Sequence, residues 1–146
     1  MQDQAAGQGV QLGIFRIYVK DLSFESPRSP KIFLAAWRPE VKVDFVVKHQ
    51  RVEGSLFEVV LGLTVEAREG KEVGFITEIE QAGVFDVRGP EGIHMDHALR
   101  VVCPNVLFPY ARQAIDQALV AGGFPPLMLA PINFEYRHEE KPESLS

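Results

Sequence analysis

The chain has one cysteine, no long apolar run and fewer basic than acidic residues, and each shortage excludes a class of protein. One cysteine cannot form an internal disulfide, as expected for a reducing compartment. No apolar stretch reaches the ~18 residues needed to span a bilayer, so we expect no direct membrane insertion. Fifteen Lys and Arg against twenty Asp and Glu give a formal net charge of −5. Nucleic acid is therefore a poor ligand, because phosphate binding needs clustered positive charge.

Motifs for common catalytic chemistry are also missing. The sequence has no phosphate-binding loop, no dinucleotide fingerprint and no G-x-S-x-G nucleophile turn. The first residues, MQDQAAGQGVQ, hold no basic stretch followed by an apolar run, so we expect no signal peptide and a cytoplasmic protein. With 146 residues, 46% of them hydrophobic, the chain suits a single domain with its own core. We place this domain at residues 10–134, between polar ends at 1–9 and 135–146 that we expect to be disordered.

Four extended segments come first along the domain. Apolar and polar residues alternate in them, which is typical of strands, and a break in the alternation near Ile14 and Phe15 indicates a bulge. The short turn at Glu69 and Gly70 predicts that the third and fourth strands form an antiparallel hairpin. The segments are residues 10–21, 40–48, 56–67 and 72–87.

The period of two separates the side chains of these strands into two faces. In the second strand Lys42, Asp44 and Lys48 lie opposite the apolar set. In the fourth strand, the face with Ile76, Glu78 and Glu80 would be exposed on an antiparallel sheet. The opposite face of the fourth strand carries Val73, Phe75, Thr77, Ile79 and Gln81. Because one face is acidic, we expect other subunits to cover the opposite one.

Helical spacing of apolar residues follows, from Met95 to the natural stop at Gly122 and Gly123. We expect Pro104 to interrupt this region, so that Asn105 caps a second helix. The prediction is therefore two helices separated by a break.

Two groups in this region are candidates for chemistry. Cys103 has apolar neighbours and no basic partner nearby in sequence, which favours a buried structural residue over a thiolate nucleophile. His94 and His97 are spaced to share a helix face and, with Cys103, would form the site of a small metal-dependent enzyme. The spacing lacks the glutamate of the HExxH motif, so solvated histidines and no metal are the better interpretation.

The loop SPRSPKIFLAAWRPE (26–40) concentrates apolar side chains, among them Phe33 and Trp37. Two interpretations stay open for it. The loop either folds over the core or forms an adaptable apolar wall for a ligand.

Five stretches of the chain, in unbroken order, resemble the signature blocks of the SecB family of bacterial protein-export chaperones. They cover nearly all of residues 10–134. The stretches are IYVKDLSFESP (17–27), FEVVLGLTVEA (57–67), FITEIEQAGVF (75–85), CPNVLFPYAR (103–112) and GGFPPLMLAPINF (122–134).

The resemblance implies an α+β fold, with a four-stranded antiparallel sheet followed by C-terminal helices, assembled as a homotetramer (a dimer of dimers). It implies a holdase without ATP chemistry or cofactor, rather than an enzyme. Such a chaperone keeps precursor proteins unfolded in the cytoplasm and passes them to the SecA motor ATPase. Any zinc in that encounter belongs to the tail of SecA.

The family's functional positions fall into three sets on this sequence. The contacts with SecA correspond to Asp21, Glu25, Ile76 and Glu78. Positions tied to tetramer assembly correspond to Thr77, Ile79 and Gln81. The apolar groove for unfolded clients corresponds to Phe33, Trp37, Val41, Val43 and Leu129.

One departure from the family concerns the end of the chain. The family continues after Phe134 into another amphipathic helix, whereas here the sequence EYRHEEKPESLS leaves room for at most a brief helical turn. The nearest alternative function is a SecB-like chaperone dedicated to one client, such as the antitoxin of a toxin–antitoxin pair.

Overall fold

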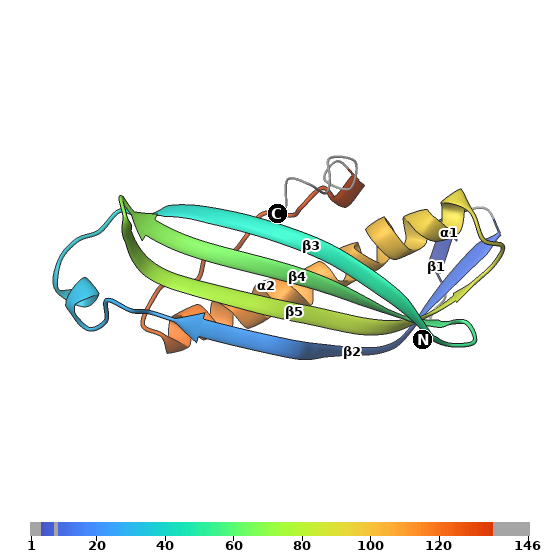
Figure 1. Cartoon of the computed structure of the whole chain (residues 1–146), viewed down its shortest axis with the longest axis horizontal. Helices are drawn as coiled ribbons and strands as arrows, with labels where there is room; N and C mark the ends of the chain where they lie inside the picture. Colours follow the sequence, from blue (N-terminus) through green and yellow to red (C-terminus); the bar gives the residue numbers. More distant parts are fainter. Residues whose placement is uncertain (1–3, 8, 136–146) are drawn as a thin grey trace.

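The computed structural model describes residues 4–7 and 9–135. One long antiparallel sheet, with strand order β1-β2-β5-β4-β3, has a long helix across one face (Figure 1). In chain order the elements are β1 (Gln4–Gly7), β2 (Val10–Glu25), the 3-10 turn η1 (Lys31–Leu34), β3 (Glu40–Glu53), β4 (Leu56–Glu69), β5 (Glu72–Arg88), α1 (Ile93–His97), the π-helical turn η2 (Ala98–Val102) and α2 (Cys103–Ala121).

The four long strands confirm the sheet predicted from the alternating segments. Strands β3, β4 and β5 pair as successive antiparallel hairpins, and β2 pairs antiparallel with β5. The register of β2 against β5 shifts between Ile14 and Arg16, where the alternation predicts a bulge. The turn between β4 and β5 is allowed by Gly70, whose φ of 64° is a conformation that favours glycine.

The prediction that both ends of the chain are disordered can be compared with the structure at residues 4–7, 9 and 135. Residues Gln4–Gly7 form β1 instead, with Gln4 opposite Leu12 of β2. The edge of β2 offers backbone N–H and C=O groups. A short segment can form hydrogen bonds with these groups regardless of its own side chains. Of the polar stretch from residue 135 onward, only Glu135 lies within the described residues, and it continues a helical turn begun at Phe134.

The core lies between the sheet and α2, on what we call the helix face of the sheet. On α2, Leu107, Ala111, Ile115 and Leu119 recur every four residues and are fully buried. Each buried Leu or Ile contributes about 1.5–3 kcal/mol to folding. The sheet side of this contact is the predicted apolar face of β4, where Phe57, Val59, Leu61, Leu63, Val65 and Ala67 are all buried.

The predicted break between two helices is wrong. α1, η2 and α2 follow one another directly, and the Cys103 N–H donates to the Ala98 carbonyl, five residues back. The wider π turn accommodates Pro104, which lacks an N–H and needs space for its ring. Val102 precedes α2 in a helical conformation, so Asn105 is not a cap. The predicted stop is confirmed, because α2 ends immediately before Gly122.

Within the described part of the chain, no helix is both long and apolar enough to cross a membrane.

The side of the sheet opposite α2, here called the open face, carries a carboxylate that is nearly covered. Glu58 on β4 is 7% exposed. Tyr18 Oη donates to it at 2.5 Å, Lys20 Nζ lies 3.0 Å from both of its oxygens, and Gln50 Nε2 donates at 3.1 Å. The Tyr18 hydrogen bond is the largest cause of a lowered pKa of Glu58. Burial opposes this shift, and the hydrogen bonds from Lys20 and Gln50 add to it. These contacts connect β2 and β3 to β4, and β2 reaches β4 across the intervening strand β5.

Cys103 offers a direct test of the core. Its side chain is fully buried and burial raises the pKa of the thiol, so the sulfur is neutral and packs as a small apolar group. Replacing Cys103 by alanine leaves a small cavity, and we expect the free energy of unfolding to fall by about 1 kcal/mol. Urea unfolding of the two proteins measures the difference. A variant as stable as the wild type would contradict this packing role.

The Glu58 contacts predict a pH dependence at the alkaline end. Burial, then the Glu58 carboxylate, raises the pKa of Tyr18 from 10.0 to about 12. The folded state therefore keeps the phenol proton longer than the unfolded state, and this stabilisation is lost as pH rises from 10 toward 12. Tyr18→Phe should lower stability by about 1 kcal/mol below pH 10, and this difference should vanish near pH 12. Urea unfolding at both pH values tests it; a difference independent of pH would contradict the assignment.

Candidate binding surfaces

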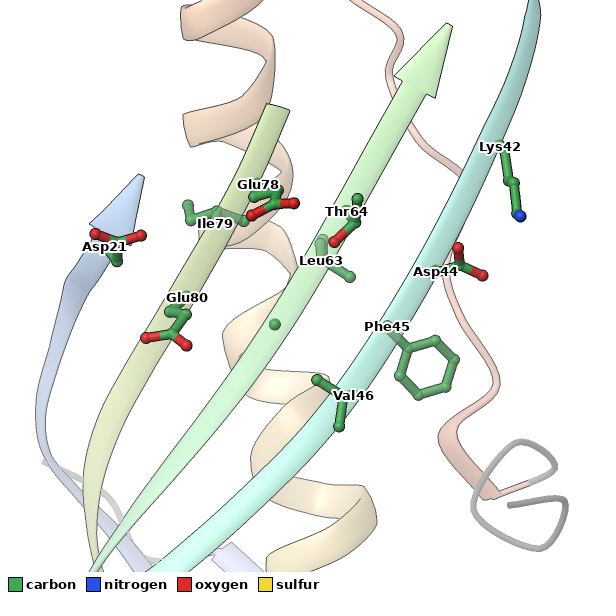
Figure 2. A pocket seen from close by; sticks show the side chains of 11 residues that line it. Asp21, Lys42, Asp44, Phe45, Val46, Leu63, Thr64, Glu78, Ile79 and Glu80 are labelled. Atoms are coloured by element: carbon green, nitrogen blue, oxygen red, sulfur yellow. The ribbon is translucent and has the colours of Figure 1, made fainter. Parts of the chain in front are cut away.

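A hollow with acidic walls lies on the open face of the sheet. Figure 2 shows carboxylates from three strands around it: Asp21 on β2, Glu78 and Glu80 on β5, and Asp44 on β3. Its volume is about 430 Å³, and Gly62 on β4 lies among the lining residues. The sheet builds this arrangement because alternate side chains of neighbouring strands project from the same side.

Charge around the hollow is partly compensated. Lys42 also lines it, and Lys48 Nζ lies 3.9 Å from a Glu80 oxygen. Among the described residues, Asp21, Asp44 and Glu78 have no ion-pair partner within 4.0 Å. The surface therefore retains negative charge that suits a basic ligand.

The four residues assigned to SecA contact come together on this face. In the pairing of β2 with β5, Glu25 lies opposite Ile76 and Ser23 lies opposite Glu78, so Asp21 and Glu25 flank Glu78 diagonally. Asp21, Glu25 and Glu78 are exposed, and Ile76 is half-buried. The family resemblance missed Asp44, although the alternation of β3 had placed it on the polar face.

The three residues assigned to tetramer assembly lie on the helix face. Thr77, Ile79 and Gln81 are at most 2% exposed, so residues of the same chain already enclose them, and their part in tetramer assembly stays a prediction. Thr77 Oγ1 donates to the Ser23 carbonyl at 2.8 Å, and Gln81 Nε2 donates to the Tyr18 carbonyl at 3.0 Å. These two hydrogen bonds connect β5 to β2.

The residues assigned to the client groove divide into two groups. Phe33 and Trp37, both in the segment between β2 and β3, meet on Phe124, with ring centroids 5.4 Å and 6.2 Å from it. Val43 and Leu129 are half-buried against the core, and Val41 is 40% exposed at the start of β3. The first group belongs to an aromatic cluster formed by Phe24, Phe33, Trp37, Phe75 and Phe124.

Leu34 and Met128 are among the exposed apolar residues that were not identified from the sequence. Leu34 on η1 is 83% exposed, and Met128, in the segment after α2, is 72% exposed. Met128 has a φ of 53°, and its N–H and that of Leu127 both donate to Asp116 Oδ1 on α2. The side chain of Asp116 thus fixes a bend that periodicity along the sequence does not reveal.

The candidate metal ligands do not form one site. His94 is exposed, Cys103 is buried, and His97 Nε2 lies 2.9 Å from an oxygen of Glu135. Across residues 4–7 and 9–135, no group of three or more His, Cys, Asp or Glu side chains has an arrangement that would hold a metal ion.

Comparisons with known proteins agree with this fold. A family model described as preprotein translocase subunit SecB matches residues 4–143. The protein-export protein SecB of Stutzerimonas stutzeri is 51% identical over 128 residues, covering 88% of this chain and 78% of that protein. The protein of the same name from Pseudomonas syringae pv. tomato is 51% identical over 127 residues, covering 87% of this chain and 77% of that protein.

A solved structure shares the fold. It is a SecB-like chaperone of Mycobacterium tuberculosis in complex with a peptide from an antitoxin, with a TM-score of 0.70 and 18% identity, covering 83% of this chain and 90% of that one. At that identity the likeness shows the fold alone. The family model spans nearly the whole chain and the curated relatives share half of its residues over most of its length: this chain belongs to the SecB family of protein-export chaperones.

Proposed function

We propose that this protein is an ATP-independent chaperone of the cytoplasm that holds precursor proteins unfolded and delivers them to the SecA motor ATPase. The observation that carries the proposal is the pairing of two unlike surfaces in one chain. The open face of the sheet offers exposed carboxylates, and the segments around the aromatic cluster expose apolar side chains. The first chemistry suits a basic partner, and the second suits the apolar residues of an unfolded chain.

Export is favoured over a role dedicated to one toxin–antitoxin pair. The relatives that share half of their residues with this chain are named protein-export proteins, whereas the antitoxin-bound chaperone shares only 18%. The acidic and apolar residues expected for SecA contact also lie together on the open face.

The proposed homotetramer is supported by two separate apolar surfaces. Past Ile14, the outer edge of β2 pairs with no other strand among the described residues, and Phe15, Val19 and Leu22 along it are 44–64% exposed. A second copy can pair with such an edge. The outer side of α2, away from the sheet, exposes Tyr110 and Val120 by 50% and 57%. Two different interfaces are what a dimer of dimers needs.

These two surfaces predict how the assembly comes apart. A charge placed in an apolar interface is buried without a partner, which opposes association. We expect Val19→Lys and Val120→Glu each to yield dimers, and the double variant to yield monomers. Light scattering measures the masses, and Lys71→Glu, an exposed change on the β4–β5 turn, serves as the charge control. A wild type that stays monomeric at all concentrations would contradict the assembly.

Delivery to SecA is tested at Glu78, which is exposed beside the hollow. Exposed ion pairs contribute only about 0–1 kcal/mol each, so binding should rest on several together and weaken with salt. Glu78→Lys should weaken binding of the basic C-terminal peptide of SecA more than Glu78→Gln, because it adds repulsion to a lost attraction. Titration calorimetry at low and high salt measures both.

The same variants provide the control for client holding. Glu78 lies on the open face and takes no part in the aromatic cluster around Phe124, so both variants should suppress aggregation of an unfolded precursor as well as the wild type does. A wild type that does not suppress aggregation would refute the holdase. Equal loss of both activities in a folded variant would refute the separation of the two surfaces.

A further inference from the structure

The indole of Trp37 lies directly on a residue without a side chain. Gly74 is the extra residue of a bulge in β5, because Ala67 of β4 pairs with Phe75 and Arg68 pairs with Val73. A Cβ atom built on Gly74 would lie 2.1 Å from Cη2 of Trp37, closer than any real contact. The ring therefore fills a recess that exists only because residue 74 is glycine.

The neighbouring rings of the aromatic cluster complete this recess. Phe124, 6% exposed, meets Trp37 edge-on with ring centroids 6.2 Å apart, and Phe75 lies 5.0 Å from Phe124. Without the indole, the space on Gly74 would be a slot with a backbone floor and Phe124 at its side. Its shape and its neighbours favour a flat aromatic ring over a branched aliphatic side chain.

The segment that carries Trp37, residues 35–39, has few other attachments. Ala35, Ala36, Arg38 and Pro39 are exposed, and only Trp37 is half-buried. One polar contact holds it: the Arg38 N–H donates to Glu69 Oε2 at 3.3 Å in an exposed position. Ile32, 4% exposed, anchors the preceding turn η1 independently, so the indole can leave Gly74 without unfolding that turn.

Apolar side chains beside this segment are already presented to solvent. Phe33 is 49% exposed and Leu34 is 83% exposed. An unfolded chain that contacts them arrives next to the slot that Trp37 fills. The chain's own aromatic ring therefore shows what kind of group fits on Gly74.

We propose that an aromatic side chain of an unfolded client binds on Gly74 in place of Trp37, so that Trp37 is an intramolecular competitor that closes this subsite when no client is bound. The proposal rests on the holdase function above and names the side-chain class that one of its subsites accepts. With Trp37 in the slot, the apparent client affinity equals the intrinsic affinity multiplied by the fraction of molecules in which the slot is open.

The first test removes the competitor. Trp37→Ala should bind a synthetic unstructured peptide of lysine, serine and phenylalanine about tenfold more tightly than the wild type, because the slot no longer has to be vacated. The matched peptide with leucine in place of each phenylalanine should gain little. Thermal unfolding checks that the variant is folded, and Trp37→Leu, a smaller change, replaces it in the same titrations if it is not.

The second test fills the slot itself. Adding Gly74→Ala to Trp37→Ala should abolish the gain, because the new methyl group occupies the floor of the slot. Gly74→Ala alone should displace the indole and shift its fluorescence to longer wavelength, a clean signal since Trp37 is the chain's single tryptophan. Gly62→Ala is the matched control: it is also a strand glycine, and its added Cβ meets only a methyl group of Val46 at 3.1 Å and more distant backbone.

The outcomes separate this proposal from the function on which it rests. A wild type that binds neither peptide and fails to hold an unfolded precursor would refute the holdase and the subsite together. A wild type that binds both, with Trp37→Ala binding the phenylalanine peptide more weakly, would show that Trp37 is a wall for clients and not their competitor. Retention of the full gain in the double variant would place the aromatic site away from Gly74.

Discussion

Burial of the helix face of the sheet by α2 is the interaction on which the other features depend. The fully buried stripe of Leu107, Ala111, Ile115 and Leu119 holds the helix on β4 and β5. Among residues 4–7 and 9–135, this contact leaves the opposite side of the sheet without a helix, so polar and charged side chains cover it instead. It also fixes where α2 ends, at Gly122, and so brings Phe124 against the start of β5, where the aromatic cluster forms.

The open face shows how a side of the sheet that no helix of the described residues covers is stabilised. Val60 and Ala82 are buried there, although no helix of the part of the chain that the structure describes packs on them. The aliphatic parts of long polar side chains can cover such residues while their charged ends stay near water. The Glu58 contacts fit this description, since Tyr18 and Lys20 reach from β2 over β5 to β4. Stability on this face therefore comes from polar contacts between strands, and the acidic hollow lies beside them.

Sequence periodicity was sufficient for the features that depend on neighbouring residues along one strand or helix. It predicted the four long strands, their two faces, the bulge near Ile14 and the buried Cys103. It failed where the deciding contact is distant in sequence or made by the backbone. β1 pairs through backbone groups, Pro104 is accepted by a π turn, and Trp37 meets a glycine 37 positions away, and none of these leaves a pattern in side-chain spacing. The family resemblance placed the acidic residues correctly on the open face, but it could not show that Thr77 and Gln81 are enclosed by their own chain.

The outer edge of β2 past Ile14 and the outer side of α2 have a geometric consequence for the proposed assembly. The outer side of α2 lies across the sheet from the acidic hollow, and pairing at the β2 edge extends the sheet in its own plane. Copies that associate in this way would leave the open faces turned to solvent. A tetramer built in this way displays the hollow in four places. A partner with more than one basic tail would then rebind before it diffuses away, and its residence time would exceed what any single exposed ion pair allows.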